Sequence, residues 1–468
     1  MGHVDQEDRP SNGEKVVMGG REALFVIASV LFIIGTSLMV FEAQPHVPLF
    51  LSISFLAIYN ALKRQSWSVV ERGIIKGIQS GIVPIMIFML IGILIAVWMK
   101  AGTLPTLIAY SFNMISPALF LPSVFLVTAI IGISIGSSFT TVSTVGIAFM
   151  GMGTALDVNL AMVAGSVVSG ALLGDKMSPM SDTTNLASSV CKVDLFEHIR
   201  HMLWTMVPAA VITMVLFFII GSGQETAPTT EVESWMAALR EATHVHVLAL
   251  IPAVVVIILA AKRVPAIPTM LTGIGVGFLT AVAFEGQLAV NEWMPLIQNG
   301  FEISSGNEQV DALVNGGGIQ SMMWAVSLLI LALSMGGILS TLGVIEALMN
   351  KLRTWMTTSG RAVATPVLTA MGLNISLGEQ YMSVVLTGEA FSDRYREMGL
   401  QGKDLSRALE SGGTVINALI PYGVAGVFMS SVLEVSVLEF LPYAFFCLLC
   451  PLITMFYGFT GIGMAKKT

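Results

Sequence analysis

The polar segment 174–185 carries the side chains best suited to chemistry in this otherwise apolar chain. It reads GDKMSPMSDTTN, with two carboxylates (Asp175 and Asp182), a lysine, a proline and several hydroxyls, and it lies between the apolar runs 160–173 and 203–220. Ionisable groups inside membrane-spanning sequence cost on the order of 3 kcal/mol each and usually mark the path of an ion or substrate. Proline also interrupts a helix, and unpaired backbone at membrane depth survives only around a protein-lined cavity. The segment therefore predicts an ion site on an interrupted helix.

The composition is that of a polytopic membrane protein. Of the 468 residues, 54% are hydrophobic and 11% are charged, whereas about 25% are charged in soluble domains. Several apolar runs approach the roughly 20 residues that cross a bilayer as a helix. The polar first residues lead into a full-length apolar run, not into a cleavable signal peptide. The three cysteines have no metal-binding or disulfide spacing. With no catalytic triad or phosphate-binding loop in the sequence, we expect no enzyme, no cofactor and no nucleic-acid partner.

Alternation of apolar and polar stretches predicts how the chain crosses the membrane. Lysine and arginine accumulate on the cytoplasmic side, which places the basic connection 63–76 and both termini in the cytoplasm. The acidic stretches 222–243 and 285–317 are then external. We expect six parts in chain order: a cytoplasmic tail (1–21), N-terminal spans (22–62), a first repeat (63–222), an external linker with connecting spans (223–303), a second repeat (304–463) and a short tail (464–468).

The chain also matches itself at a nearly constant distance. The tetrapeptide GIQS that begins at Gly77 recurs 241 positions later at Gly318, and Gly102 pairs with Gly343 at the same distance. After Gly102 the distance between matching residues increases by one position to 242. At this distance the sequence pairs Ser134 with Ser376, Gly136 with Gly378, Gly146 with Gly388, Ser169 and Gly170 with Ser411 and Gly412, and Pro179 with Pro421. A constant spacing over such a length indicates an internal repeat.

Charge predicts that the two copies have opposite orientations. The basic connection 63–76 corresponds to the acidic stretch 285–317, and the segment 151–159, which has no lysine or arginine, corresponds to the basic segment 392–407. Inverted repeats whose discontinuous helices meet near the middle of the bilayer are typical of secondary transporters. We therefore expect an all-α polytopic membrane protein with two inverted-topology repeats, re-entrant hairpins and broken helices.

The repeat predicts four polar breaks that face one another. Two are re-entrant tips, at 134–138 and 374–380, and two are interrupted helices, at 175–184 and 417–423. Glycine at a tip lets the backbone turn and expose carbonyl oxygens. Carbonyl, hydroxyl and carboxylate oxygens suit hard cations such as Na⁺, so these breaks can hold a cation, whereas half-helix N-termini favour an anionic substrate.

Three carboxylates at these breaks, Asp175, Asp182 and Glu379, are the candidates for exchanging Na⁺ against protons. A carboxylate that binds either ion but not both couples the two fluxes by competition, and Lys176 can neutralise Asp175 when Na⁺ is absent. The candidate neutral ligands are Ser134, Ser137, Ser138, Ser178, Ser181, Thr183, Asn185, Asn374, Ser376 and Asn417. The direct Na⁺ ligands are expected to be Asp182, Ser181, Asn374 and Glu379.

Each polar residue also has a structural interpretation. Serine and threonine in membrane helices often bond only the backbone or a neighbouring helix. Asp182 can cap the helix that follows it, and Asp175 can form a structural pair with the adjacent lysine. Gly170 and Gly412 are better explained as packing contacts. Glu379, at a tip of otherwise neutral residues, has the weakest structural explanation.

The string GDKMSPMSDTTN resembles the polar motif of the NhaC family of sodium/proton antiporters, within the wider ion-transporter superfamily. The resemblance extends from Glu22 to about Gly463. It implies exchange of external protons for internal sodium across the cytoplasmic membrane of bacteria. The same family includes malate/lactate exchangers and related amino-acid carriers, and superfamily members often form homodimers.

The primary functional prediction is a Na⁺/H⁺ antiporter that works by alternating access, with sodium ions, protons and membrane lipid as its partners. The alternative is a sodium- and proton-coupled exchanger of small organic acids or amino acids, because the hydroxyls and amides at the tips suit a carboxylate substrate. Internally inverted halves with polar breaks argue against a continuous pore, and therefore against a channel. A membrane enzyme lacks its catalytic groups in this sequence.

Overall fold

The chain is almost entirely helical. The computed structural model describes residues 18–41, 43–111, 119–179, 181–222, 237–262, 264–286, 290–304, 311 and 314–465. Six helices in these ranges are long and apolar enough to cross a membrane, or up to eight if each of two bent helix pairs counts as one span. The expected all-α, multi-pass membrane fold is therefore confirmed. Most of the expected N-terminal tail (1–17) and part of the expected external linker (223–236) lie outside the described residues.

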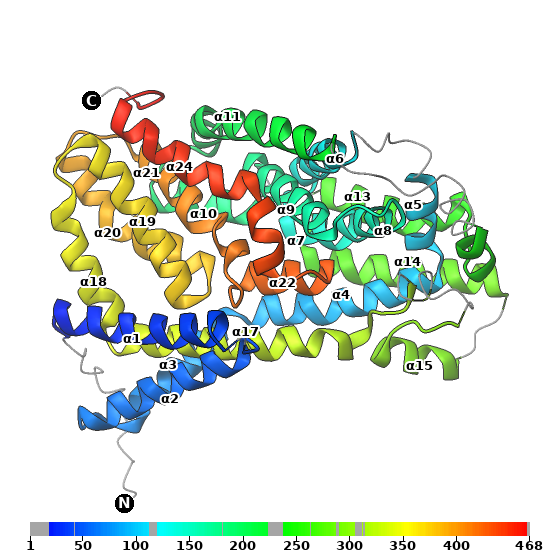
Figure 1. The fold of residues 1–468 in the computed structure, drawn as a ribbon, viewed down its shortest axis with the longest axis horizontal. Helices are drawn as coiled ribbons and strands as arrows, with labels where there is room; N and C mark the ends of the chain where they lie inside the picture. Colours follow the sequence, from blue (N-terminus) through cyan, green and yellow to red (C-terminus); the bar gives the residue numbers. More distant parts are fainter. Residues whose placement is uncertain are drawn as a thin grey trace, which may run out of the picture.

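One layer of helices supports the parts of the chain that carry the breaks. Its main members are α1 (Gly20–Met39), α2 (His46–Leu62), α3 (Trp67–Ser80), α4 (Ile82–Lys100) and α17 (Gly318–Thr341), with α14 (Ala266–Glu285), α13 (Ile251–Ala261) and α15 (Val290–Asn299) at one end (Figure 1). The backbones of α3 and α17 touch, because a Cβ added at Gly77 would lie 2.0 Å from the Leu333 carbonyl oxygen and one at Gly337 would lie 2.0 Å from that of Gly73. Small residues allow this close approach in membrane proteins.

The breaks lie on helices that pack above this layer in Figure 1. In the first half these are α5 (Thr103–Ser111), α6 (Phe120–Ile135), α7 (Ser138–Thr141), α8 (Ile147–Ala155), α9 (Leu160–Met177) and α10 (Asp182–Val190). In the second half they are α18 (Val344–Leu352), α19 (Ser359–Leu377), α20 (Gln380–Glu397), α21 (Gly402–Leu409) and α22 (Val424–Leu433). Two further helices, α11 (Leu195–Gly221) and α24 (Phe445–Thr460), cover them.

Helix boundaries recur at the spacing found in the sequence. The helices α9 and α21 begin at residues 160 and 402, and α10 and α22 begin at residues 182 and 424. The helices α6 and α19 end at residues 135 and 377. All three pairs are 242 positions apart, so the repeat extends from residue types to the positions where helices start and stop.

One packing contact also recurs at this spacing. A Cβ added at Gly170 would lie 2.4 Å from the Phe125 carbonyl oxygen, and one added at Gly412 would lie 2.3 Å from the Val367 carbonyl oxygen. Both members of the second contact are 242 positions after those of the first. The packing explanation for these two glycines is confirmed, whereas the opposite orientation of the two halves stays a prediction.

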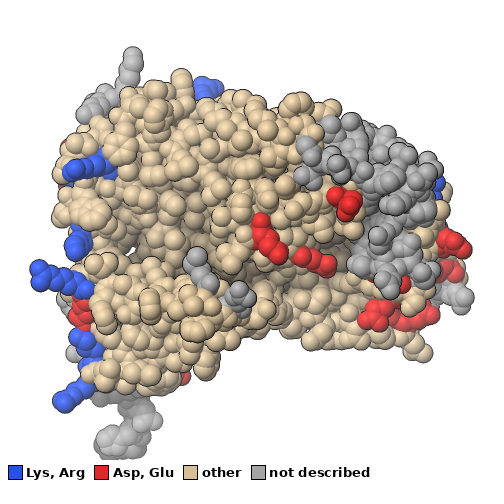
Figure 2. Space-filling view, viewed as in Figure 1, with Lys and Arg blue, Asp and Glu red and all other residues tan. Residues whose placement is uncertain are grey.

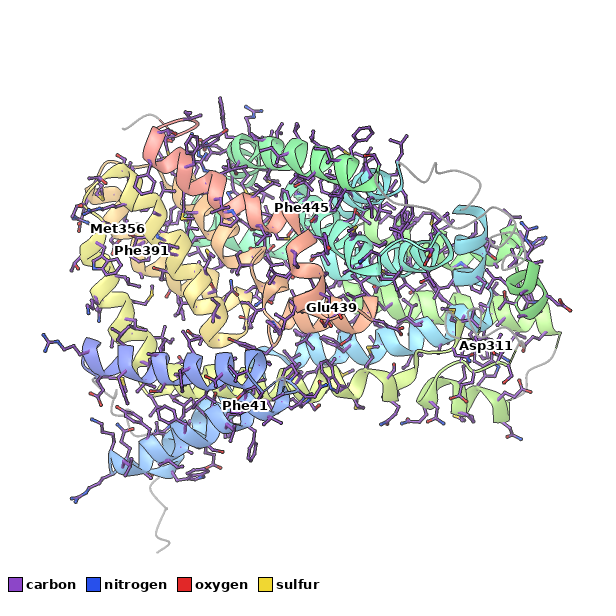
Figure 3. All side chains as sticks on the ribbon, viewed as in Figure 1. Phe41, Asp311, Met356, Phe391, Glu439 and Phe445 are labelled. Atoms are coloured by element: carbon purple, nitrogen blue, oxygen red, sulfur yellow. The ribbon has the colours of Figure 1, made fainter. Side chains whose placement is uncertain are left out.

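Basic and acidic residues are distributed unevenly over the molecule. On the face shown in Figure 2, most of the Lys and Arg lie at the end shared by α18, α19 and α20, and most of the Asp and Glu lie at the middle and toward the opposite end. Figure 3 places Met356 and Phe391 at the first of these ends and Asp311 at the other. At the acidic end, Lys100 Nζ lies 2.8 Å from a carboxylate oxygen of Glu285.

Candidate functional site

The first tip forms between α6 and α7. Gly136 has a φ of 74°, a left-handed conformation that favours glycine, and its N–H donates to the Gly132 carbonyl oxygen at 2.7 Å. Ser137 then caps α7, because its Oγ accepts the Thr140 N–H at 3.3 Å. The buried Ser138 donates its hydroxyl to Asp175 Oδ2 at 2.8 Å. The tip thus supplies a hydroxyl to the first interrupted helix. Ser134 lies in α6, but its side chain is outside the described part of the structure.

The first interrupted helix breaks between α9 and α10. The N-cap of α10 is Ser181, whose Oγ accepts the Thr184 N–H at 3.3 Å, so the capping interpretation of Asp182 was wrong by one residue. Asp182 is instead the first helical residue, and its Oδ2 accepts the Tyr381 hydroxyl at 2.5 Å. This contact joins the break in the first half to the chain just after the second tip.

Other polar residues of this break hold its shape. Asn185 Nδ2 donates to the carbonyl oxygens of Pro179 at 2.9 Å and Ser181 at 2.7 Å. Thr183 Oγ1 lies 3.0 Å from Ser181 Oγ. The Ser178 N–H donates to the Asp175 carbonyl oxygen at 3.1 Å. Backbone that leaves the helical pattern is therefore satisfied locally, as buried peptide groups require.

The second tip is built like the first. Gly378 has a φ of 69°, and its N–H donates to the Asn374 carbonyl oxygen at 2.7 Å. Glu379 then caps α20, because its two carboxylate oxygens accept the backbone N–H groups of Tyr381 at 2.9 Å and Met382 at 2.7 Å. A carboxylate at a helix N-terminus is favourable. Glu379 thus has a clear structural role, contrary to the expectation from the sequence.

Two amides connect the second tip to the second break. Asn374 Nδ2 donates to the carbonyl oxygens of Gly412 at 3.2 Å and Gly413 at 2.5 Å. Asn417 Nδ2 donates to Asn374 Oδ1 at 3.0 Å, and Asn417 Oδ1 accepts the Ala425 N–H at 2.7 Å. Ser376, which lies in the second tip two residues after Asn374, donates its hydroxyl to the Gly372 carbonyl oxygen at 2.7 Å. These three candidate ligands therefore make their described bonds within the second repeat.

A small cavity of about 200 Å³ lies where the two halves meet. Its polar lining comes from the end of α3, the first tip, the first break and the end of the second tip: Ser80, Ser137, Thr140, Asp175, Asp182, Gln380 and Tyr381. Aromatic rings close part of its wall: the ring centroids of Phe139 and Phe428 are 4.5 Å apart, and those of Phe88 and Phe428 are 5.2 Å apart.

The expected Na⁺ ligands do not all line this cavity. Asp182 does, whereas Glu379 lines a neighbouring groove of about 280 Å³ and Asn374 lies at the second break. Tyr381 links the two carboxylates, since its N–H donates to Glu379 and its hydroxyl donates to Asp182. The structure thus brings together Asp175, Asp182 and the hydroxyls of the first tip.

Comparison with known sequences decides the family. A sequence model of the Na⁺/H⁺ antiporter family matches residues 170–462, which include the first interrupted helix, the second tip and the second interrupted helix. The chain belongs to the Na⁺/H⁺ antiporter family. The family is one of transporters, not enzymes, and the resemblance drawn from the polar segment 174–185 is confirmed.

Several relatives match nearly the whole chain. The Na⁺/H⁺ antiporter NhaC of Alkalihalophilus pseudofirmus is 44% identical over 95% of this chain and 96% of its own length. The malate-2H⁺/Na⁺-lactate antiporter of Bacillus subtilis is 33% identical over 94% of each chain. The arginine/ornithine antiporter ArcD of Halobacterium salinarum is 34% identical over 99% of this chain and 95% of its own.

This antiporter-family chain also contains a buried ion pair that the sequence analysis missed. Lys176 Nζ lies 3.9 Å from Glu410 Oε2, and the exposed fractions of the two side chains are 1% and 0%. Lys176 therefore pairs with the second half of the chain, and the alternative structural pair with Asp175 is not the one that forms. Glu410 begins a π-helical turn (Glu410–Thr414), a distortion that is frequent at functional sites.

The sequence analysis did not name Glu410 or Tyr381 as site residues, although the sequence contains a signal for each. Glu410 is a lone acid in a stretch that continues to Leu419 without another charge, and it directly precedes the Ser411 and Gly412 of the repeat. Tyr381 directly follows the predicted tip 374–380. An ionisable residue inside membrane-spanning sequence is a site candidate by default, which applies to Glu410 as it did to Asp175.

Proposed function

We propose that this chain exchanges Na⁺ for protons across the bacterial cytoplasmic membrane by alternating access. The observation that carries the proposal is the cavity in which Asp175 and Asp182 meet Tyr381 from the second repeat. Carboxylate and hydroxyl oxygens are suitable Na⁺ ligands. The 44% identity to an NhaC Na⁺/H⁺ antiporter over most of both chains supports the same activity.

Competition for the two carboxylates couples the fluxes in this proposal. Asp175 and Asp182 hold Na⁺ when deprotonated and release it when protonated. Asp182 is exposed, whereas Asp175 is 4% exposed, so an empty site leaves the buried negative charge of Asp175 uncompensated, which is costly. The site therefore changes its accessibility only when it carries Na⁺ or protons. Ser137, Ser138 and Ser181 are the proposed neutral groups around it, and Glu379 acts through Tyr381 as the cap that positions this residue.

The size and lining of the cavity favour bare ions over organic acids. Pockets for small organic ligands usually measure about 300–1,000 Å³, whereas this cavity measures about 200 Å³. Among the described residues that line it there is no lysine, arginine or histidine to bind a carboxylate. Lys176, the nearest basic residue in sequence to Asp175, faces Glu410. We therefore prefer Na⁺/H⁺ exchange to exchange of malate, lactate or amino acids.

The orientation proposed from sequence has support in the distribution of charge. Lys and Arg gather at the end of the molecule where α18 and α20 end (Figure 2), and basic residues accumulate on the cytoplasmic side. We propose that this end and both termini face the cytoplasm, and that the two repeats are inverted. The homodimer implied by the family resemblance also stays a proposal.

Flux measurements with the purified protein in proteoliposomes test this function. An outward Na⁺ gradient is expected to drive proton uptake, detected by an enclosed pH-sensitive dye, without any organic acid present. Equal gradients of K⁺ and choline are the controls for ionic strength and are expected to give the rate of protein-free vesicles. Proton movement that requires malate, lactate or arginine would contradict the proposal and support the alternative function.

A further inference from the structure

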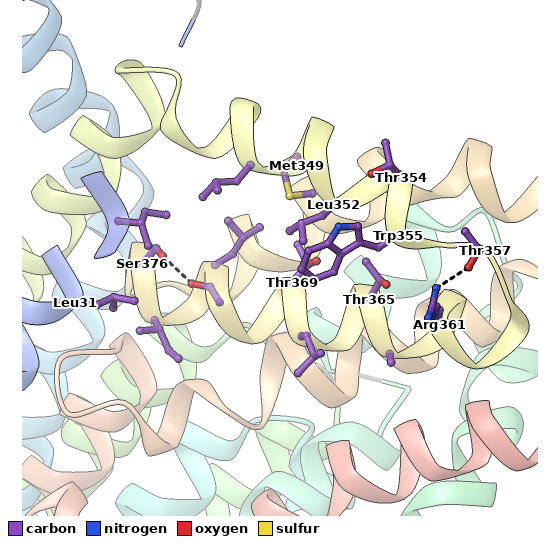
Figure 4. Close-up of a pocket in the computed structure, with 17 residues that line it drawn as sticks. Leu31, Met349, Leu352, Thr354, Trp355, Thr357, Arg361, Thr365, Thr369 and Ser376 are labelled. Atoms are coloured by element: carbon purple, nitrogen blue, oxygen red, sulfur yellow. Dashed lines mark hydrogen bonds between the residues drawn. The ribbon is translucent and has the colours of Figure 1, made fainter. Parts of the chain in front are cut away.

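A long groove of about 640 Å³ lies between α1, α18 and α19, apart from the carboxylate cavity (Figure 4). Its walls are mainly apolar, with Leu31 from α1, Leu352 from α18 and Leu368 and Leu373 from α19. Leu31 and Leu368 are 38% and 54% exposed, so the groove opens to the surroundings of the protein. At the depth of a membrane span these surroundings are lipid chains, which fill apolar grooves.

One end of the groove suits an anionic headgroup. Arg361, in the first turn of α19, lies there with Thr354 and Thr357, and its guanidinium donates to Thr357 Oγ1 at 3.1 Å (Figure 4). Trp355 lies beside them and is 58% exposed. Tryptophan is enriched at the membrane–water interface, and arginine is well suited to phosphate. This is also the end of the molecule at which basic residues gather.

The other end of the groove lies deeper in the membrane-spanning part, and its floor carries fewer side chains. A Cβ added at Gly372 would have no heavy atom within 4 Å, so this exposed glycine leaves free space in the groove floor. Arg361 and Gly372 are 11 residues apart on α19, which corresponds to roughly 16 Å along a helix. Half of the roughly 30 Å hydrocarbon core is about the same length. The distance therefore matches one acyl chain in one leaflet.

We propose that this groove binds one anionic glycerophospholipid, with its phosphate at Arg361 and one acyl chain along α19 as far as Gly372. Ser376 closes the deep end of the groove, two residues before the Gly378 turn of the second tip. The bound chain thus packs against the helix that carries this tip. The inference concerns a lipid site and does not depend on the identity of the transported ions.

Native mass spectrometry of the full chain in a non-ionic detergent tests the site, with phosphatidylglycerol and phosphatidylcholine of identical acyl chains as probes. The wild type is expected to retain one phosphatidylglycerol in preference to phosphatidylcholine. Gly372→Leu is expected to weaken retention of both lipids about tenfold, the effect of losing roughly two buried methylene contacts. Arg361→Gln is expected to remove the preference for phosphatidylglycerol. Because Arg361 is exposed, this second variant stays informative if leucine disturbs α19.

Two variants of the same chemistry serve as matched controls. Gly275 is an exposed glycine on α14 with equally open space around it, and Arg72 is an exposed arginine that donates to the hydroxyl of Ser68, four residues earlier, at 3.3 Å. Gly275→Leu and Arg72→Gln are expected to retain lipid as the wild type does. Equal retention by Gly372→Leu and Gly275→Leu would overturn the site, and an unchanged preference in Arg361→Gln would overturn the anionic headgroup.

Discussion

Asp175→Asn is expected to reduce Na⁺-driven proton flux in proteoliposomes to the level of protein-free vesicles. Asp175 is 4% exposed and accepts the Ser138 hydroxyl at 2.8 Å. Asparagine preserves the size of the side chain and its ability to accept this hydrogen bond, but it does not release a proton. Because a neutral amide is cheaper to bury than a carboxylate, the variant is expected to melt at the wild-type temperature or above it. The melting temperature therefore distinguishes a loss of transport in this variant from a loss of folding.

Asp157→Asn is the matched control for this substitution. Asp157 is exposed, lies between α8 and α9, and has a φ of 53°, a left-handed conformation that asparagine tolerates well. The Asp157→Asn variant is expected to exchange Na⁺ for protons at the wild-type rate. If Asp175→Asn also exchanged Na⁺ for protons at the wild-type rate, the proposed site would be misplaced.

Removing one partner of the Lys176–Glu410 pair is expected to cause the largest loss of stability. Either Lys176→Met or Glu410→Gln leaves the other side chain charged and almost fully buried, and breaking a buried pair in this way costs about 3–5 kcal/mol. The double variant removes both charges and is expected to recover most of that loss. Thermal melting of the purified proteins measures the effect.

An exposed pair provides the comparison for this double-mutant cycle. Lys403 Nζ lies 2.6 Å from Glu197 Oε1, with side chains 22% and 53% exposed. Surface pairs contribute about 0–1 kcal/mol, so Lys403→Met is expected to melt close to the wild type. A Lys176→Met protein that is as stable as Lys403→Met would show that the buried pair does not join the two repeats as the 3.9 Å contact suggests.

The interruptions of the helices were predictable because glycine and proline act locally. Gly136 and Gly378 take left-handed conformations at the two tips, and Pro179 lies in the gap between α9 and α10. The repeat could also have predicted the cap at Glu379. It follows Gly378 as Ser137 follows Gly136, and Ser137 is a typical capping residue.

Contacts between the halves were not predictable from local patterns. The pairing of Lys176 with Glu410 and of Tyr381 with Asp182 depends on how two distant helical breaks pack. Sequence periodicity predicts which residues lie on one helix but not which side chain reaches across to another. The capping residue of α10 was displaced by one position, from Asp182 to Ser181, because helix ends are uncertain by one or two residues.

The tyrosine across the cavity gives a way to perturb the carboxylates without removing them. Tyr381→Phe deletes the hydroxyl that donates to Asp182 and preserves the ring. The variant removes one oxygen from the cavity and the hydrogen bond that orients Asp182, so Na⁺ is expected to bind more weakly. Tyr422→Phe is the matched control, since its hydroxyl donates to the Ile375 carbonyl oxygen at 2.6 Å away from the cavity. It is expected to leave the Na⁺ affinity unchanged.

Calorimetry tests most directly whether Na⁺ and protons compete at Asp175 and Asp182. The purified protein is titrated with Na⁺ at a series of pH values, in buffers with different heats of ionisation. The competition predicts that Na⁺ binding releases protons and that its dissociation constant rises by up to about tenfold for each unit of falling pH and for each proton released. The account also predicts that Tyr381→Phe binds Na⁺ more weakly than the wild type and Tyr422→Phe. Na⁺ binding with the same affinity at every pH and without proton release would contradict it.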